Sequence, residues 1–260
     1  MIRSLLLPVL TRAARALMGA RMPALLQRAN RNCVNLLYEN LKTKEGISMR
    51  FYTLAVTIFL CALLSYACAD PAANKPKATV GEATSEKSAP KPAGETLTIS
   101  PANSKIDFVA AKVTRSHNGS FKQFSGTIDL LNSDPLQSVV SIAIDTASVE
   151  TDEPDLTKHL QTPDFFDVAK FPKANFVSTK IEPSTANGAT HTITGNFELH
   201  GVKKSISFPA TIQVAPNSVS VNAEFAINRK DFNLTYPGKA DDLIKDGVVI
   251  KLSLNVPRKP

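Results

Sequence analysis

The sequence predicts an all-β domain between residues 97 and 260, built as an antiparallel barrel or sandwich of about eight strands. Apolar side chains recur at every second position in successive segments, which is typical of strands with one buried and one wet face. Turn-forming residues separate these segments. Only residues 155–166 lack the alternation. With 43% apolar residues in 260, the chain can form a sizeable core.

The alternating segments define the expected strands. In 190–201, Ile193, Phe197 and Leu199 share one face while Thr194 and Glu198 occupy the other. The other segments repeat this pattern with Val, Ile, Phe and Ala on the apolar face. The expected strands lie at residues 106–110, 124–130, 140–144, 175–181, 190–201, 205–214, 218–228 and 248–256.

Turn signals lie between these segments. They are Asn118-Gly119, Ser133-Asp134-Pro135, Asn187-Gly188, Ala215-Pro216-Asn217 and Tyr236-Pro237-Gly238. The stretch without alternation predicts a short helix from Asp155 to Leu160, which stops before Thr162-Pro163 because a residue that precedes proline disfavours helical geometry.

Residues 1–48 read as a leader outside the mature fold. Six arginines lie among Leu and Ala with no acid before Glu39, as in a mitochondrial presequence. The alternative is that translation starts at Met49 and that these residues are upstream sequence. We favour the second interpretation, because a complete export signal follows Met49 directly.

Residues 49–69 are that export signal. Arg50 gives a positive start, Leu54–Leu64 is an apolar run, and Ser65-Tyr66-Ala67 supplies small residues for cleavage after Ala67 or Ala69. Alternatively, residues 64–68 resemble a bacterial lipobox, in which Cys68 becomes the lipidated first residue, although the lipobox prefers Leu where Ser65 stands. An uncleaved anchor is a further alternative, since residues 51–69 are just long enough to span a bilayer. We favour the lipoprotein.

Residues 70–96 are rich in Ala, Pro, Lys and Glu and poor in large apolar groups. Such a segment buries too little surface to order itself, so we expect a disordered, solvated linker. The sequence thus predicts an exported protein, either a bacterial periplasmic or outer-membrane-anchored lipoprotein that meets the membrane surface through Cys68, or a secreted protein.

Charge and cysteine content exclude several function classes for the domain. The net charge of +7 resides upstream, because residues 97–260 carry 17 basic and 17 acidic side chains. A neutral domain has no long-range attraction for phosphate backbones, so we expect no nucleic-acid partner. Cys33, Cys61 and Cys68 all precede the domain, which therefore has neither a disulfide nor a thiolate.

Small residues on the apolar faces raise the prospect of a hollow interior. Gly126, Ala110, Gly195, Ala210 and Ala223 stand where a dry core would carry Leu or Phe. A closed sheet of about eight strands holds either packed side chains or one small ligand. On alternation alone, a ligand cavity and a packed core remain equally open.

A resemblance to a known family favours the cavity. Six segments resemble the YceI-like family in matching order, within a region of about 97–256: Ser104–Val109, Phe121–Ile128, Ile144–Asp152, His159–Val168, Phe171–Phe176 and Thr194–Ile206. This resemblance implies a lipocalin-like β-barrel with one short helix near the barrel mouth. It also implies a bound polyisoprenoid, an isoprenoid quinone-like molecule or another amphipathic lipid, and no single catalytic chemistry.

Fourteen residues form the expected ligand site. Phe165, Phe166 and Phe171 would close the mouth over the lipid chain, or else form a plain hydrophobic plug. The others would face the interior: Phe108, Phe124, Ile128, Ile142, Ile144, Ile193, Phe197, Phe208, Ala223, Phe225 and Ile227.

Two other classes of function remain as alternatives. Asp152, Glu153, Asp155 and His159 crowd together as metal ligands can, but their spacing matches no calcium loop, and a solvated helix start explains them equally well. No nucleophile elbow, zinc-binding His-Glu motif or phosphate-binding glycine loop occurs. A packed barrel that binds partners through its loops is the third class. We therefore expect no enzyme, no catalytic residues and no metal site.

Overall fold

The computed structural model describes residues 70–85 and 94–258. The predicted leader and the export signal with Cys68 lie outside these residues. Among the described residues, no helix combines the length and apolar character that crossing a bilayer requires.

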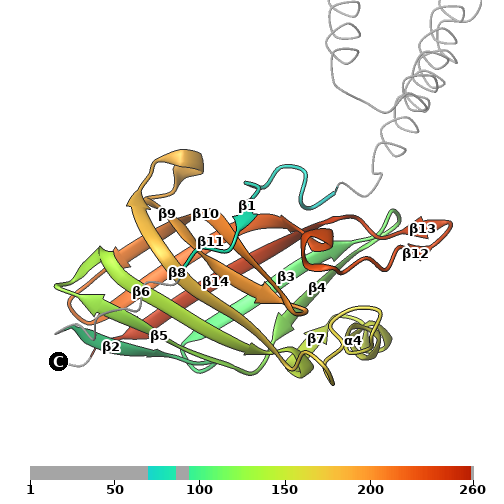
Figure 1. Ribbon diagram of the computed structural model, residues 1–260, viewed down its shortest axis with the longest axis horizontal. Coiled ribbons are helices and arrows are strands. Elements are labelled where there is room, and N and C mark those ends of the chain that lie inside the picture. The colour runs from blue at the N-terminus through green and yellow to red at the C-terminus, as the bar shows by residue number, and fades with distance from the viewer. Residues whose placement is uncertain (1–69, 86–93, 259–260) are drawn as a thin grey trace, which may run out of the picture. The chain divides into compact units, whose positions relative to one another are not determined.

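Twelve strands form one curled antiparallel sheet, shown in Figure 1. Along the sheet the order is β2-β5-β6-β8-β9-β10-β11-β14-β3-β4-β7, with β1 added beside β10. Strands β12 and β13 form a separate hairpin. The strands are β1 Thr79–Glu82, β2 Glu95–Ile99, β3 Ser104–Ala111, β4 Ser116–Phe121, β5 Phe124–Leu131, β6 Asp134–Asp145, β7 Val149–Thr151, β8 Lys173–Pro183, β9 His191–Leu199, β10 Val202–Val214, β11 Ser218–Asn228, β12 Gly238–Lys239, β13 Asp242–Leu243 and β14 Gly247–Pro257.

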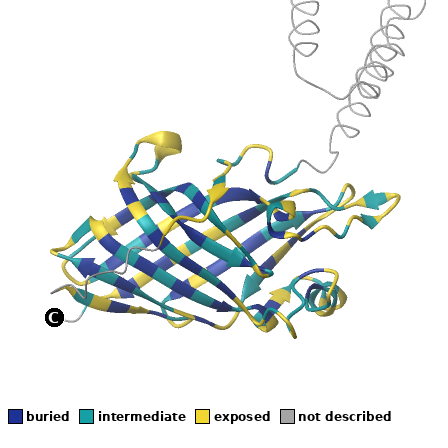
Figure 2. Cartoon of the chain, viewed as in Figure 1, coloured by how far each residue is buried: buried dark blue, intermediate teal, exposed yellow. Residues whose placement is uncertain are grey.

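The predicted fold class is confirmed: a lipocalin-like, curled antiparallel barrel with a short helix. Each of the eight expected strands corresponds to an observed one, and β11 matches residue for residue. Along these strands buried and less buried residues alternate, as Figure 2 shows. The short helix α4 runs from Pro154 to Leu160, with Pro154 in the first turn where its missing N–H costs nothing.

One turn prediction was wrong. Asn118-Gly119 lies inside β4 rather than between strands. Gly119 pairs with Phe108 of β3, and a Cβ at this position would collide with the Phe108 ring. The glycine therefore makes room for an aromatic ring inside the barrel instead of making a turn.

Residues 70–85 differ from the expected solvated linker. They form a segment, here called the strap, that lies in the seam where β10 and β11 diverge. These strands pair directly only at Thr211–Val214. Beyond that point β1 pairs with β10, and Ala78 N–H donates to the Ala226 carbonyl of β11 at 2.8 Å.

Backbone pairing explains why the strap orders without large apolar side chains. Its N–H and C=O groups satisfy two open strand edges, which composition does not reveal. The side chain of Asn196 adds a two-sided lock, because its amide accepts from Thr84 N–H at 3.0 Å and donates to Thr84 O at 2.6 Å.

The two ends of the barrel differ in construction. At one end β2 and β14 are tied together, with Arg258 Nε 2.8 Å from a Glu95 carboxylate oxygen and Asn255 N–H donating to Asn103 O at 3.1 Å. We call this the closed end. At the opposite end lie α4, β7 and the β12–β13 hairpin (Figure 1), and we call it the mouth.

Candidate functional site

Two adjacent chambers occupy the interior of the barrel. The outer chamber, at the mouth, has a volume of about 100 Å³, and the inner chamber about 70 Å³. They share five lining residues and so lie next to each other, and together we call them the channel: Phe121, Ile144, Phe197, Ile227 and Ile250. Strand alternation produces this lining, because every second side chain of β6, β11 and β14 points inward.

The lining is almost entirely apolar. The outer chamber is completed by Phe108, Ala110, Leu160, Phe165, Phe166, Ala174, Leu199, Arg229, Leu234, Ile244 and Val248. The inner chamber is completed by Ile106, Asp107, Phe176, Ile206, Phe208, Phe225 and Leu252. Only Arg229 and Asp107 carry charge, so the channel can hold a hydrocarbon chain but offers few partners to a polar molecule.

Burial along β14 shows where the channel ends. Its inward-facing residues Val248, Ile250 and Leu252 are only half-buried, because they face the chambers. The next two, Leu254 and Val256, are 1% and 0% exposed. The hollow therefore occupies the mouth side of the barrel, while the closed end is a packed core.

Aromatic rings narrow the channel. Phe121 stands 5.7 Å from both Phe108 and Phe166, measured between ring centroids. Deeper inside, Phe208 stacks on Phe225 at 4.1 Å. Since typical small-molecule pockets measure about 300–1,000 Å³, the channel suits a thin chain, and a long occupant requires these rings to rotate.

Nine of the fourteen predicted site residues line the chambers. They are Phe108, Ile142, Ile144, Phe165, Phe166, Phe197, Phe208, Phe225 and Ile227. The structure places Phe124, Ile128, Ile193 and Ala223 in the buried core cluster instead, outside either lining. Phe171 packs on His200 with ring centroids 4.6 Å apart, at the β9–β10 turn, and does not line the channel.

The small residues do not create the hollow in the way the sequence suggested. A Cβ at Gly126 would collide with the Ser141 carbonyl, and one at Gly195 would lie 2.5 Å from the Phe176 ring. These glycines allow close packing of a neighbouring strand and ring. Ala110 does line the outer chamber, whereas Ala210 and Ala223 lie in the buried core cluster, outside both linings.

Sequence reasoning missed several wall residues. Phe121 lies at the centre of the channel, yet it ends a strand that was expected to be a turn. Four further wall residues lie on the apolar faces of expected strands, so the alternation alone could have identified them: Ile106, Ile206, Ile250 and Leu252. The alternation of apolar residues identifies which side chains face inward. It does not show how far along the barrel axis a residue lies, and this position decides whether the residue lines a chamber or belongs to the packed core.

Arg229 is the unexpected member of the outer chamber. Its residue is 3% exposed, and its guanidinium donates to backbone carbonyls of Leu234, Lys245 (3.1 Å) and Ile244 (3.5 Å). A carboxylate oxygen of Asp246 lies 3.5 Å away. Burial lowers the pKa of the guanidinium and Asp246 opposes that shift. The side chain thus holds the 229–246 loop across the mouth and places one cation at the rim of an apolar channel.

An aromatic cluster forms part of the wall beside α4. The His159 ring lies 5.0 Å from Phe165 and 5.1 Å from Tyr236, edge-on in both cases. Its Nε2 lies 2.8 Å from an Asp164 carboxylate oxygen. This contact fixes the ring orientation and holds Phe165 against the outer chamber.

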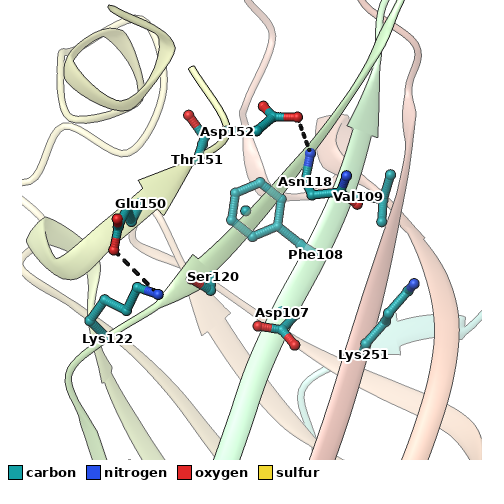
Figure 3. A pocket seen from close by; sticks show the side chains of 11 residues that line it. Asp107, Phe108, Val109, Asn118, Ser120, Lys122, Glu150, Thr151, Asp152 and Lys251 are labelled. Atoms are coloured by element: carbon teal, nitrogen blue, oxygen red, sulfur yellow. Dashed lines mark hydrogen bonds and ion pairs between the residues drawn. The ribbon is translucent and has the colours of Figure 1, made fainter. Parts of the chain in front are cut away.

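A polar hollow of about 340 Å³ lies on the outer face of β3, β4 and β7. Figure 3 shows Asp107, Lys122, Glu150 and other polar side chains around it, with the Phe108 ring behind the ribbon of β4. The dashed pairs join Lys122 Nζ to Glu150 at 3.3 Å and the Asp152 carboxylate to Asn118 N–H at 3.2 Å. Lys122 and Glu150 thus pair with each other, whereas Asp152 bonds to the Asn118 backbone and Lys251 lies 3.4 Å from Glu224, so these charged groups do not converge on one point.

The acidic cluster does not assemble as the metal alternative requires. Asp152 bonds to His117 at 2.9 Å, Glu153 lies 3.9 Å from Arg115, Asp155 pairs with Lys158, and His159 pairs with Asp164. In the part of the chain that the structure describes, no three His, Cys, Asp or Glu side chains are grouped to hold a metal. Burial opposes ionisation of Asp152, but hydrogen bonds from His117 and Asn118 outweigh it and lower its pKa.

Comparison with known proteins agrees with this geometry. The YceI-like domain model matches residues 97–256. Protein YceI of Salmonella arizonae is 36% identical over 123 residues, a match covering 45% of this chain and 63% of the relative's length.

Two solved structures share the fold. BcnA of Burkholderia cenocepacia superimposes with a TM-score of 0.55 at 26% identity, covering 60% of this chain and 98% of BcnA. A polyisoprenoid binding domain from Saccharophagus degradans gives a TM-score of 0.51 at 18% identity, covering 64% of this chain and 99% of that domain. Taken with the match of the domain model, these likenesses show that the chain belongs to the YceI-like domain family.

Proposed function

We propose that this protein binds an amphipathic lipid with one long, thin apolar chain, of the polyisoprenoid or isoprenoid quinone type, and carries or stores it. The observation that supports this most strongly is the pair of adjacent apolar chambers, which share the wall residues Phe121, Phe197 and Ile250. An empty channel of this kind is unfavourable, by about 24 cal/mol per Å³ of cavity, so an apolar occupant stabilises the protein.

The shape of the channel favours a single chain over a bulky ligand. Its two chambers follow one another along the barrel and are narrowed where Phe121 meets Phe108 and Phe166. A protein of the same fold is a polyisoprenoid binding domain, which supports the proposal of such a chain as the occupant. The lipid's polar head would remain at the mouth, where Arg229 supplies the cationic group.

Blocking the outer chamber tests the proposal. Ala110 lines this chamber from β3, so Ala110→Leu fills much of the space available there. We expect the organic extract of purified full-length Ala110→Leu protein to lose the lipid that mass spectrometry detects with the native protein. The added side chain costs about 1–3 kcal/mol of stability by overpacking.

The matched control is Ala143→Leu, which adds the same atoms to the opposite face of β6, between inward-facing Ile142 and Ile144. This variant should retain the lipid. A native protein without any extractable lipid, or an Ala110→Leu protein that binds as much as native, would overturn the proposal.

We further propose that the protein is exported and is held at a bacterial membrane through lipidated Cys68. The apolar run Leu54–Leu64 and the small residues before Cys68 support this proposal, as does a barrel without cysteine. Full-length protein expressed in a bacterium with an outer membrane should incorporate labelled fatty acid. Cys68→Ser should abolish incorporation, and labelling that persists in this variant would contradict lipidation.

A further inference from the structure

Three large apolar side chains stand out on the described surface. Val113 is 51% exposed, Leu243 48% and Leu136 44%. Val113 and Leu243 are neighbours, because Val113 N–H donates to Leu243 O at 3.0 Å. Leu136 lies apart from them, near the start of β6.

Val113 and Leu243 form a projecting tip at the mouth. The β3–β4 turn and the β12–β13 hairpin extend together beyond the sheet there, as Figure 1 shows, joined also by a bridge between Lys112 and Ile244. The tip is continuous with the channel, since Ala110 and Ile244 line the outer chamber.

Charge around the tip suits an anionic surface. Residues 112–115 and 239–245 carry four basic side chains and two acidic ones. Asp242 is bonded to Lys112 at 2.8 Å and to Thr114 Oγ1 at 2.9 Å, and Arg115 lies 3.9 Å from Glu153, so the tip keeps a small basic excess. Apolar side chains flanked by basic groups are typical of segments that settle into the headgroup region of a bilayer.

The first residues of the strap lie in this same half of the molecule. Ala72 packs with Ala226 and Val249 on the outer surface, and it lies so close to Gly247 that a Cβ there would be 2.8 Å away. Gly247 begins β14 only four residues after Leu243. Lys75 further fastens the strap to Glu224 at 2.8 Å.

The chain upstream of the strap limits how far the barrel can stand from a membrane. The apolar run Leu54–Leu64 and Cys68 precede Asp70, where the strap begins. Two residues span at most about 7 Å, so a lipid on Cys68 would hold Asp70 close to the bilayer surface. No long tether separates Cys68 from the barrel, because residues 70–85 are bound to the barrel.

We propose that the tip formed by Val113 and Leu243 inserts into the surface of a phospholipid membrane and turns the channel mouth toward the bilayer. The occupant of this surface is an anionic bilayer. Where the channel holds a lipid, as in the proposed function, this orientation lets the chain pass between barrel and membrane without crossing water.

Tryptophan fluorescence tests the contact directly, because the native chain contains no tryptophan. Full-length Leu243→Trp and Leu136→Trp proteins are mixed with vesicles of phosphatidylcholine and phosphatidylglycerol that carry brominated acyl chains. We expect a blue shift and strong quenching for Leu243→Trp, and solvent-like, unquenched emission for Leu136→Trp. No quenching for Leu243→Trp, or equal quenching for both variants, overturns the proposal.

A second measurement follows lipid exchange. Replacing both Val113 and Leu243 by Ser should slow release of the bound lipid into vesicles on the order of tenfold, because two apolar side chains no longer enter the bilayer. Leu136→Ser should exchange at the native rate. An unchanged rate in the double variant contradicts the proposed route.

The two proposals can fail separately. If lipid co-purifies with the Leu243→Trp protein but the tryptophan stays unquenched, the proposed membrane contact is wrong and the proposed lipid binding stands. A quenched tryptophan in a protein without extractable lipid would do the reverse.

Discussion

The mouth and the closed end of the barrel are made from the same strands but packed differently. Along β14, Val248, Ile250 and Leu252 face the channel and are half-buried, whereas Leu254 and Val256 lie in a filled core. One period-two pattern therefore supports both a binding cavity and a packed end. The closed end of the barrel therefore contributes most of the packed core, while the mouth side provides the space for a ligand.

Polar anchoring differs between the ends as well. At the closed end Arg258 joins Glu95, the Ala215 carbonyl and the Ser133 hydroxyl near the surface. At the mouth Arg229 is buried and donates to backbone carbonyls of the 229–246 loop. The Arg258 side chain is 19% exposed. A fully buried cation with several carbonyl partners is costly to remove, while one that solvent reaches contributes less.

Truncating β14 at two heights should show the largest difference. Leu254→Ala leaves a cavity in a filled core and should lower the free energy of unfolding by about 3–5 kcal/mol. Ile250→Ala removes atoms that already border a hollow, so we expect about 1–2 kcal/mol. Urea unfolding of both variants provides the measurement, and equal losses would contradict a division of the barrel into hollow and filled ends.

The two arginines offer the next test. Arg229→Met leaves several buried carbonyls without donors and should cost about 2–4 kcal/mol. Arg258→Met should cost about 1 kcal/mol or less, because solvent can replace its partners. If the order of the two losses is reversed in the same unfolding experiment, Arg229 does not fix the mouth.

Releasing the strap should produce a smaller and local effect. Asn196→Ala removes both hydrogen bonds to Thr84 and should lower stability by about 1–2 kcal/mol. We expect faster hydrogen exchange at residues 78–84 and faster proteolysis after Lys75 or Lys77, with exchange in β14 unchanged. A strap that stays protected in this variant would show that backbone pairing with β10 alone holds it.

The smallest effect concerns Asp152. Its pKa is lowered, since hydrogen bonds from His117 and Asn118 outweigh the effect of burial. The carboxylate therefore stabilises the fold at pH values above its ordinary pKa of 3.8, and this contribution disappears as the pH falls through the lowered value. Because the side chain is 38% exposed, solvent screening keeps the contribution below about 1 kcal/mol.

Asp152→Asn measures this contribution. Native protein should be more stable than the variant near neutral pH, and the two stability curves should converge in acid. Stability curves that stay parallel at all pH values would show that the Asp152 carboxylate contributes no stability through its bonds to His117 and Asn118.

Local patterns predicted most of the fold, because period two directly determines which face of a strand is buried. The same logic located inward-facing Ile144, Phe197 and Phe208. The alternation could not show that Ile193 lies in the packed core and Ile250 in the chamber wall. The position of a residue along the barrel axis depends on strand tilt and register, which the local sequence does not determine.

Contacts distant in sequence explain the remaining misses. The strap orders because β10 and β11 diverge and leave open edges more than a hundred residues away. Gly119 looks like a turn residue until the Phe108 ring is placed over it. Arg229 reads as a surface charge, and only the fold surrounds it with carbonyls.

Electron density for the channel of natively purified, detergent-free protein tests lipid occupancy most directly. We expect one continuous feature without a fork that runs from Phe166 past Phe121 to Phe208, with its polar end at the mouth. Protein rings closed over an empty channel, in crystals of protein that never met a detergent or organic solvent, would contradict this expectation.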